Sequence, residues 1–165
     1  MEIRLARLDD LPAITEIYNN AIMKTAATFD TEPRSMKQQE IWFNSHTSRF
    51  PIRVAEKDKT VIGWAAVSVF CDRCAYNATG EVSLYISENY RNKGYGRKLL
   101  EELIKVTEQL DYHVLIARIA EGNQASIHLF ESLGFFHVGV MKEVGYKFNR
   151  LLDVYLMQKL LAKKF

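Results

Sequence analysis

The chain has 165 residues, of which 48% are apolar and 25% are charged, and its formal net charge is +2. This balance is typical of a soluble globular protein with a substantial core, so we expect a single domain over residues 1–165. The small charge gives no support for a nucleic-acid or membrane-surface partner, and no apolar run approaches the roughly 20 residues of a membrane span. The N-terminus lacks the apolar stretch of a secretory signal, so we expect a cytoplasmic location.

The first segments are predicted to be a strand followed by a helix. Residues Ile3–Arg7 alternate in polarity as a half-buried strand does. From Leu11 to Ile22 the apolar residues recur at helical spacing, which predicts an amphipathic helix. Asp9 or Asp10 could cap its N-terminus.

A polar loop over residues 25–34 separates this helix from a second one. Ser35 and Gln38 have the spacing of a capping box, in which each side chain bonds the other residue's backbone N–H. Three segments with strand-like composition follow, namely Ile52–Glu56, Val61–Phe70 and Glu81–Ser87.

Cys71 and Cys74 form a Cys-x-x-Cys pair in the loop before the last of these strands. A zinc site needs four ligands, and no second cysteine pair or close histidine pair completes one. A thioredoxin-like redox pair would open a helix, whereas this pair lies between two strands. We therefore interpret the two thiols as incidental and expect no metal site.

The run from Asn89 to Leu100 lies between a predicted strand and an amphipathic helix, and it contains the pattern R-x-x-G-x-G at Arg91, Gly94 and Gly96. Such a junction gathers free backbone N–H groups and the positive end of a helix dipole, which suits a phosphate group. An ordinary turn followed by a helix is the alternative, because short glycine patterns recur by chance. The dinucleotide pattern G-x-G-x-x-G is absent, since position 99 is a leucine.

The C-terminal third continues the alternation of strands and helices. A strand over Val114–Ala120 precedes a helix over Ala125–Leu133, which Gly134 could terminate in a left-handed conformation. The segments Phe136–Val144 and Leu151–Gln158 then form a predicted hairpin. The order of elements predicts a mixed α/β sheet with helices on both faces.

The sequence resembles the GCN5-related N-acetyltransferase superfamily over almost its full length. The segments that carry this resemblance are Glu81–Ile86, Arg91–Gly96, Asn123–Ser126 and Leu133–Phe135. Within the superfamily it is similar to the phosphinothricin and methionine-sulfone acetyltransferase branch, on the segments Ile17–Ala21, Thr28–Pro33, Ala75–Tyr76 and Glu143–Asp153. The resemblance implies a single-domain α/β (α+β) fold with one splayed strand pair, acetyl-coenzyme A as cosubstrate, and a homodimer.

The resemblance also assigns the donor site. The backbone of Leu84, Tyr85 and Ile86 would pair with the pantetheine arm like an added strand, and one of its amides would polarise the thioester carbonyl. The other implied donor-binding residues are Arg91, Asn92, Lys93, Gly94, Tyr95, Gly96, Arg97, Asn123 and Ser126. For Asn123, a structural role as a loop and helix-cap residue is an equal alternative.

Acyl transfer to an amine requires an uncharged nitrogen, so a group must take the proton of the ammonium. Glu81 is our candidate for this general base, directly or through a water molecule. The alternative is that Glu81 only binds the ammonium or pairs with a nearby arginine. Tyr85 and Tyr76 could assist proton handling, and no acid is assigned for the leaving thiolate because Leu129–Glu131 carries no tyrosine.

The acceptor pocket is predicted from residue chemistry near the segments shared with the branch. The candidate acceptor-binding residues are Phe29, Arg73, Ala75, Tyr76 and Lys147. Arg150 is a further cation near these segments, and arginine suits a carboxylate or phosphinyl group because its fork binds both oxygens. The hairpin tip over residues 147–152 could approach the pocket of a second subunit. The four histidines are treated as structural.

The predicted activity is acetyl transfer to a small amino-acid-like amine, such as phosphinothricin, methionine sulfone or methionine sulfoximine. Two alternatives stay open. The acceptor could be another free amine, such as a polyamine, an aminoglycoside or a protein N-terminus. The protein could also be a non-catalytic acyl-CoA-binding module.

Overall fold

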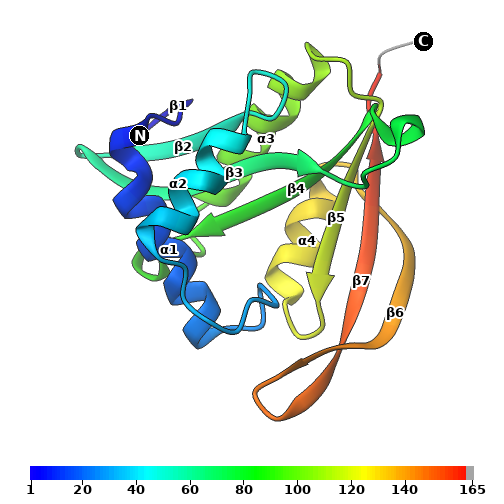
Figure 1. The fold of residues 1–165 in the computed structure, drawn as a ribbon. Helices are drawn as coiled ribbons and strands as arrows, with labels where there is room; N and C mark the ends of the chain where they lie inside the picture. Colours follow the sequence, from blue (N-terminus) through cyan, green and yellow to red (C-terminus); the bar gives the residue numbers. More distant parts are fainter. Residues whose placement is uncertain (163–165) are drawn as a thin grey trace.

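The computed structural model describes residues 1–162, so the last three residues of the predicted domain 1–165 lie outside the described part. Figure 1 shows the arrangement of the elements. In chain order they are β1 (Glu2–Leu5), α1 (Leu11–Lys24), α2 (Met36–Ser45), β2 (Ile52–Lys57), β3 (Thr60–Val69), β4 (Thr79–Ile86), α3 (Tyr95–Glu108), β5 (Val114–Ala120), α4 (Gln124–Ser132), β6 (Phe136–Lys147) and β7 (Arg150–Leu160).

The strands form one seven-stranded sheet in the order β1-β2-β3-β4-β5-β7-β6. Neighbouring strands are antiparallel except β4 and β5, which are parallel. The mixed sheet predicted from the order of elements is therefore confirmed.

The parallel pair β4–β5 separates part-way along its length. It is paired only from Thr79–Val114 to Glu81–Ile116, whereas β4 remains paired with β3 as far as Ile86. On the other side, β5 remains paired with β7 as far as Ala120. Figure 1 shows the two strands diverging beyond this point, which confirms the splayed pair that the family resemblance implied.

Helices cover both faces of the sheet, as expected (Figure 1). On one face, Ile14 and Ile17 of α1 pack with Val54 and Trp64 of the sheet. On the other face, α3 and α4 cover a larger core that contains Leu99, Leu103, Leu115, Ile127 and Phe130. Because side chains alternate along a strand, Val82 faces the α3 core and Tyr85 faces α1.

The two predicted helix caps have different outcomes. The capping box before α2 is confirmed, because Ser35 Oγ accepts from the N–H of Gln38 at 3.3 Å and Gln38 Oε1 accepts from the N–H of Ser35 at 2.8 Å. The prediction that an aspartate side chain caps α1 is wrong, because the side chain of the N-cap residue Asp10 accepts no hydrogen bond from the first turn of the helix. The Asp10 carboxylate accepts from the Arg7 N–H at 2.7 Å and pairs with Arg4, so it closes the turn before the helix.

The C-terminal hairpin is longer than predicted. Its two turn residues, Phe148 and Asn149, both have positive φ angles, so the pairing of β6 with β7 continues to Lys147–Arg150. A register shift between Met141 and Gly145 bends β6. Gly134 ends α4 with φ +84°, as predicted.

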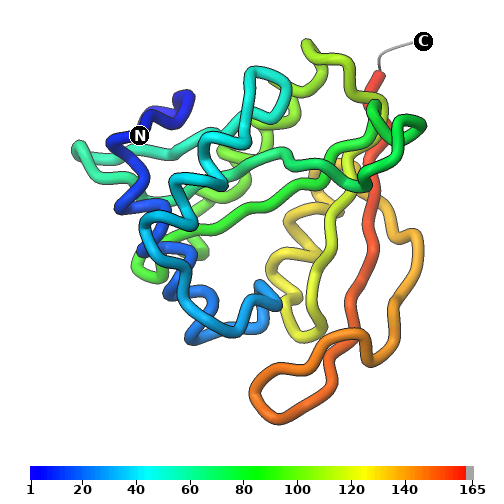
Figure 2. Tube along the Cα trace, in the orientation of Figure 1, coloured from blue at the N-terminus to red at the C-terminus, as the bar shows by residue number. Residues whose placement is uncertain are grey.

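The loop between α1 and α2 meets this hairpin at one end of the molecule. Figure 2 traces both segments to the region beside the end of β5. Lys147 Nζ donates to the carbonyl of Thr28 at 2.7 Å, which joins segments 119 residues apart in the sequence. None of the helices described for residues 1–162 is long and apolar enough to cross a membrane.

Candidate active site

The glycine loop turns β4 into α3 and leaves a run of backbone amides without partners. Asn92 and Gly94 adopt left-handed conformations, with φ of 58° and 78°, and Gly94 is the N-cap of α3. Among the described residues, no hydrogen-bond acceptor is found for the N–H groups of residues 92–97, and the first helical bond runs from Lys98 N–H to the Gly94 carbonyl. These amides and the positive end of α3 form a seat for an anion.

The cations of the loop support its backbone. Arg91 Nε donates to the Ile86 carbonyl at 3.1 Å, and Lys93 Nζ donates to the Asn89 carbonyl at 2.8 Å. Arg97 pairs with Glu101 one helical turn later. The side chains that were predicted to surround the anion therefore also hold the loop in shape.

A cleft of about 540 Å³ extends from this loop into the gap between the splayed strands. Its lining includes most of the predicted donor-binding residues, namely Leu84, Tyr85, Ile86, Arg91, Asn92, Gly94, Gly96, Arg97, Asn123 and Ser126. Lys93 and Tyr95 belong to the loop but do not line the cleft. The predicted donor site thus coincides with a connected cavity.

Asn123 has the structural role that was left open for it. Its side-chain oxygen accepts from the N–H of Ser126 at 3.3 Å, which caps α4. The same two residues also line the cleft, so the capping contact places them beside the splayed strands.

A second cavity of about 560 Å³ lies between the loop after α1 and the diverging ends of β4 and β5. It is bounded by the loop between α1 and α2, including Phe29 and Asp30, and by Met141 and Val144 of β6. The two cavities share six lining residues, which are Ala26, Ala27, Leu84, Tyr85, Asn123 and Ser126. The two cavities are therefore adjacent where β4 and β5 part.

Glu81 lines this second cavity and forms a bidentate ion pair with Arg118. Arg118 Nε donates to Glu81 Oε1 at 2.6 Å, and Arg118 Nη2 contacts the other carboxylate oxygen. The hydrogen bond to Glu81 raises the pKa of Arg118. Pairing with a nearby arginine, one of the alternatives kept for Glu81, is thus observed.

Two tyrosines that pack edge to face line the same cavity as this ion pair. The ring centroids of Tyr85 and Tyr18 are 5.1 Å apart, and those of Tyr85 and Trp64 are 4.8 Å apart. Burial raises the pKa of Tyr85, and it raises the pKa of Tyr18 to about 12. Both hydroxyls therefore keep their protons at physiological pH, and that of Tyr18 donates to Asp30.

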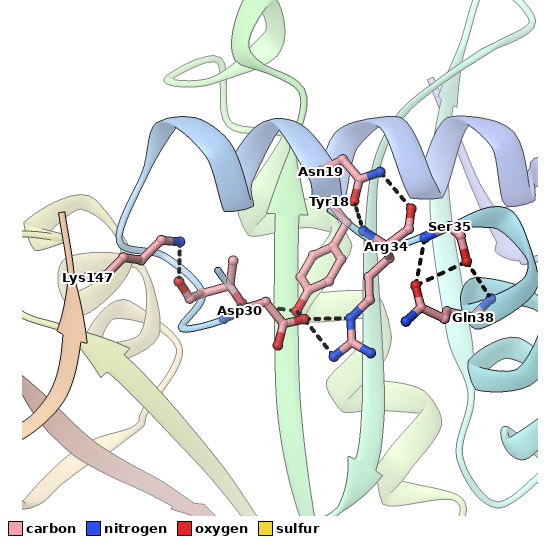
Figure 3. A network of polar contacts seen from close by, with 8 residues as sticks. Tyr18, Asn19, Asp30, Arg34, Ser35, Gln38 and Lys147 are labelled. Carbon is pink, nitrogen blue, oxygen red and sulfur yellow. Dashed lines mark hydrogen bonds and ion pairs between the residues drawn. The ribbon is translucent and has the colours of Figure 1, made fainter. Parts of the chain in front are cut away.

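The loop that bounds the second cavity is held by a polar network (Figure 3). Tyr18 of α1 donates to Asp30 Oδ2 at 2.8 Å, and Arg34 pairs with the same carboxylate. On the other side, Lys147 of β6 points to the loop and binds the Thr28 carbonyl. Burial lowers the pKa of Lys147, which lies behind the loop and outside the cavity lining.

Comparison with known proteins identifies the family. The family model described as "Acetyltransferase (GNAT) domain" matches residues 3–156. This chain belongs to the GNAT acetyltransferase family. The L-amino acid N-acyltransferase MnaT of Escherichia coli is 39% identical to this GNAT domain, with 96% of this chain and 92% of the relative covered. A methionine sulfoximine/methionine sulfone acetyltransferase of Salmonella typhimurium is 37% identical over 96% of this chain and 93% of the relative.

Solved structures of GNAT relatives share the whole fold. A phosphinothricin acetyltransferase from Sinorhizobium meliloti in complex with acetyl-CoA has a TM-score of 0.95 at 37% identity, covering 99% of this chain and 91% of the relative. The protein YncA from Salmonella typhimurium with its cofactor acetyl-CoA has a TM-score of 0.97 at 36% identity, covering 100% of this chain and 96% of the relative. The fold predicted from the resemblance is confirmed.

Three predicted acceptor residues of this GNAT domain lie away from both cavities. Arg73, Ala75 and Tyr76 are exposed in the loop between β3 and β4, and none lines either cavity. The ring of Tyr76 packs against Phe70. Within one chain, the structure brings Phe29 to the cavity with Glu81 and does not bring these three residues there. In the same loop Cys71 and Cys74 are free thiols.

Two residues of the cavity were missed by the sequence analysis. Arg118 occupies an exposed position between buried residues of β5, and only the parallel register with β4 shows that it reaches Glu81. Tyr18 lies within the apolar pattern of α1, where an aromatic residue reads as ordinary core. No signal in the sequence connects it to Asp30.

Proposed function

We propose that this GNAT domain transfers the acetyl group of acetyl-CoA to the amine of a small amino-acid-like acceptor of the phosphinothricin, methionine sulfone or methionine sulfoximine type. The observation that carries the proposal is the pair of adjacent cavities at the point where β4 and β5 part. One end has unpartnered amides suited to a diphosphate, and the other has a carboxylate suited to an amine. Relatives at 37–39% identity are named for acyl transfer to amino acids or their sulfone analogues.

The chain fits the donor through its backbone. The amides of residues 92–97 would hold the diphosphate, and the unpaired edge of β4 at Leu84, Tyr85 and Ile86 would hold the pantetheine arm. When bound, acetyl-CoA supplies an acetyl group activated as a thioester. A free amide of β4 would stabilise the negative charge that develops on the carbonyl oxygen.

Glu81 is proposed as the general base. It would take a proton from the acceptor ammonium, after which the nitrogen lone pair forms the new bond to the acetyl carbon. The carbon–sulfur bond then breaks, CoA departs with the electron pair on sulfur, and the new amide nitrogen loses its second proton to that sulfur or to water. A thiolate is a stable leaving group because thiols have pKa values near 8.5, so no dedicated acid is required. The neutral hydroxyl of Tyr85 would remain as a donor beside the reacting atoms.

The acceptor would lie in the second cavity, with Phe29 as one wall. Arg73, Ala75 and Tyr76 could reach an acceptor only in a different arrangement of their loop or in a neighbouring copy. Lys147 would act indirectly, by holding the loop that carries Phe29. We locate the reaction in the cytoplasm.

A homodimer is part of the proposal. β6 is an edge strand of the sheet and carries a row of exposed apolar side chains, namely Phe136, Val138, Val140, Val144 and Tyr146. An edge of this kind offers unpaired backbone groups as well as apolar surface to a second copy. The tip of the β6–β7 hairpin would then lie near the neighbouring subunit's cavity.

An acceptor panel tests the proposed function. The purified protein is incubated with acetyl-CoA and either methionine sulfone, phosphinothricin, spermidine, an aminoglycoside or a short peptide, and acetylated products are measured by mass spectrometry. A thiol reagent alone is a poor readout because Cys71 and Cys74 are free. Acetylation of the amino-acid analogues supports the proposal. Acetylation of only the other amines, or CoA binding without any product, contradicts it.

A further inference from the structure

Arg118 lines the second cavity, where the acceptor is proposed to bind and which we call the acceptor cavity. It is the one lysine or arginine among the described residues that line this cavity. Within residues 1–162 its guanidinium bonds Glu81 alone, through both Nε and Nη2. The cavity therefore contains an ion pair whose arginine has no other hydrogen-bonding partner within residues 1–162, at the point where β4 and β5 separate.

Stability of the fold does not explain this pair. The Arg118 side chain is 50% exposed and that of Glu81 is 17% exposed, so solvent weakens their attraction. Ion pairs in contact with solvent contribute little to the stability of a fold. The strands around the pair are already fixed by the pairing of β4 with β3 and of β5 with β7.

Two of the other cations considered for acceptor binding, Lys147 and Arg150, are engaged elsewhere, and the third, Arg73, does not line the cavity. Lys147 binds the Thr28 carbonyl behind the loop, and Arg150 pairs with Glu121 beside the donor cleft. Arg34 pairs with Asp30 on the outer side of the loop. A carboxylate that enters the acceptor cavity of one chain is therefore expected to bind Arg118.

We propose that an amino-acid acceptor binds by exchanging partners with the Glu81–Arg118 ion pair. The α-carboxylate of the acceptor takes the guanidinium fork of Arg118, and its ammonium takes the carboxylate of Glu81. A zwitterion carries the same two charges as the pair, separated by one carbon atom, so each group that loses a partner gains another. The planar fork of arginine can bind both oxygens of the incoming carboxylate.

The exchange gives the site a means of selecting amino acids. Before the acceptor binds, both oxygens of Glu81 are occupied by Arg118. An amine without a carboxylate would have to displace Arg118 from Glu81 without giving the guanidinium a new charged partner. An amino acid compensates Arg118 and at the same time frees Glu81 to accept the proton. This inference rests on the proposed function and assigns its acceptor-recognition residue.

Steady-state kinetics with two matched acceptors test the exchange. Methionine sulfone is compared with its α-carboxamide, which retains the amine and side chain but lacks the negative charge. In Arg118→Gln, we expect kcat/KM for the sulfone to fall about 10- to 100-fold, the cost of losing a charge-assisted bidentate contact, while kcat/KM for the amide changes less than threefold. Arg118→Lys should recover part of the loss.

Lys105→Gln is the control variant. It removes one exposed positive charge on α3 and should leave kcat/KM for both acceptors unchanged. An equal fall for both acceptors in Arg118→Gln would overturn the proposal.

A binding experiment separates this inference from the proposed function. The Nε–H resonance of Arg118 is observed by NMR in the CoA-bound protein and assigned by its loss in Arg118→Lys. We expect methionine sulfone to shift this resonance, and the amide to leave it in place, at concentrations that saturate the shift of the Met141 methyl group in the cavity. An unchanged Arg118 resonance at saturating sulfone would overturn the exchange, even if the protein acetylates the sulfone. If neither acceptor is acetylated, the proposed function fails and this resonance still decides the exchange.

Discussion

Glu81 occupies the last position at which β4 is paired with β5, so its side chain stands at the opening between the strands. As the proposed base it should affect turnover and not donor binding. We expect Glu81→Gln to lower kcat by roughly 10²- to 10⁴-fold, the usual contribution of a positioned base. The dissociation constant for CoA, measured by calorimetry, should stay unchanged. A parallel loss of CoA affinity would show that Glu81 supports the fold of the site instead.

The ring of Phe29, in the loop between α1 and α2, packs directly against Gly145 of β6. A side chain at position 145 would overlap the ring of Phe29, so the ring occupies the space that glycine leaves. We expect Gly145→Ala to lower the free energy of unfolding by about 1–3 kcal/mol, because of overpacking, and to raise the KM for the acceptor. Denaturant unfolding and steady-state kinetics measure the two effects.

The double variant supplies the control for this contact. In Phe29→Ala the ring is absent, so adding Gly145→Ala should cost little further stability. Such non-additivity is the signature of two residues in direct contact. Simple addition of the two single effects would contradict the packing described here.

At the level of single residues, the sequence allowed only part of the candidate site to be predicted. Glu81 was proposed because it begins the strand that precedes the glycine motif, which the family resemblance places beside the thioester. Arg118 was missed because its proximity to Glu81 depends on a parallel register between strands 37 residues apart. Arg73, Ala75 and Tyr76 were expected at the acceptor, yet their loop lies outside the cavity of their own chain, and residue chemistry alone cannot reveal which way a loop folds.

Among the elements, the N-terminus of α3 carries the proposed donor site, and its shape depends on Gly94. At φ +78°, a residue with a Cβ atom is strained by roughly 1–2 kcal/mol. We expect Gly94→Ala to shift the loop away from this conformation and to weaken CoA binding about tenfold or more, as measured by calorimetry.

Gly134 offers a matched control for this substitution. It has φ +84° at the end of α4 and lines neither cavity. Gly134→Ala should therefore lower the melting temperature to a similar extent without changing the affinity for CoA. If both variants weaken CoA binding equally, the effect belongs to global stability and not to the anion seat.

Local patterns were sufficient to predict most elements, because polarity alternation, helical spacing and capping residues are short-range signals. The length of the β6–β7 hairpin was underestimated. Its turn uses Phe148 and Asn149 in left-handed conformations, without the glycine that normally marks such a turn. The contact of this hairpin with the loop after α1 is long-range and has no local signal.

For the molecule as a whole, the exposed apolar row on β6 predicts self-association. We expect the protein to be a dimer by light scattering at micromolar concentration. Val140→Lys places a charge in the middle of the row and should shift the protein toward the monomer. Ile41→Lys, at an exposed apolar position on α2, is the control and should remain dimeric. A wild-type protein that is monomeric at all concentrations would contradict this prediction.

We propose that donor and acceptor occupy the two adjacent cavities and meet where β4 and β5 part. A crystal structure of the protein with CoA and methionine sulfone tests it most directly. We predict the diphosphate on the amides of residues 92–97, the CoA sulfur in the gap between the strands, and the acceptor amine within hydrogen-bond distance of Glu81. A diphosphate bound elsewhere, or an acceptor amine on the far side of the sheet from the CoA sulfur with no opening between them, would contradict the account.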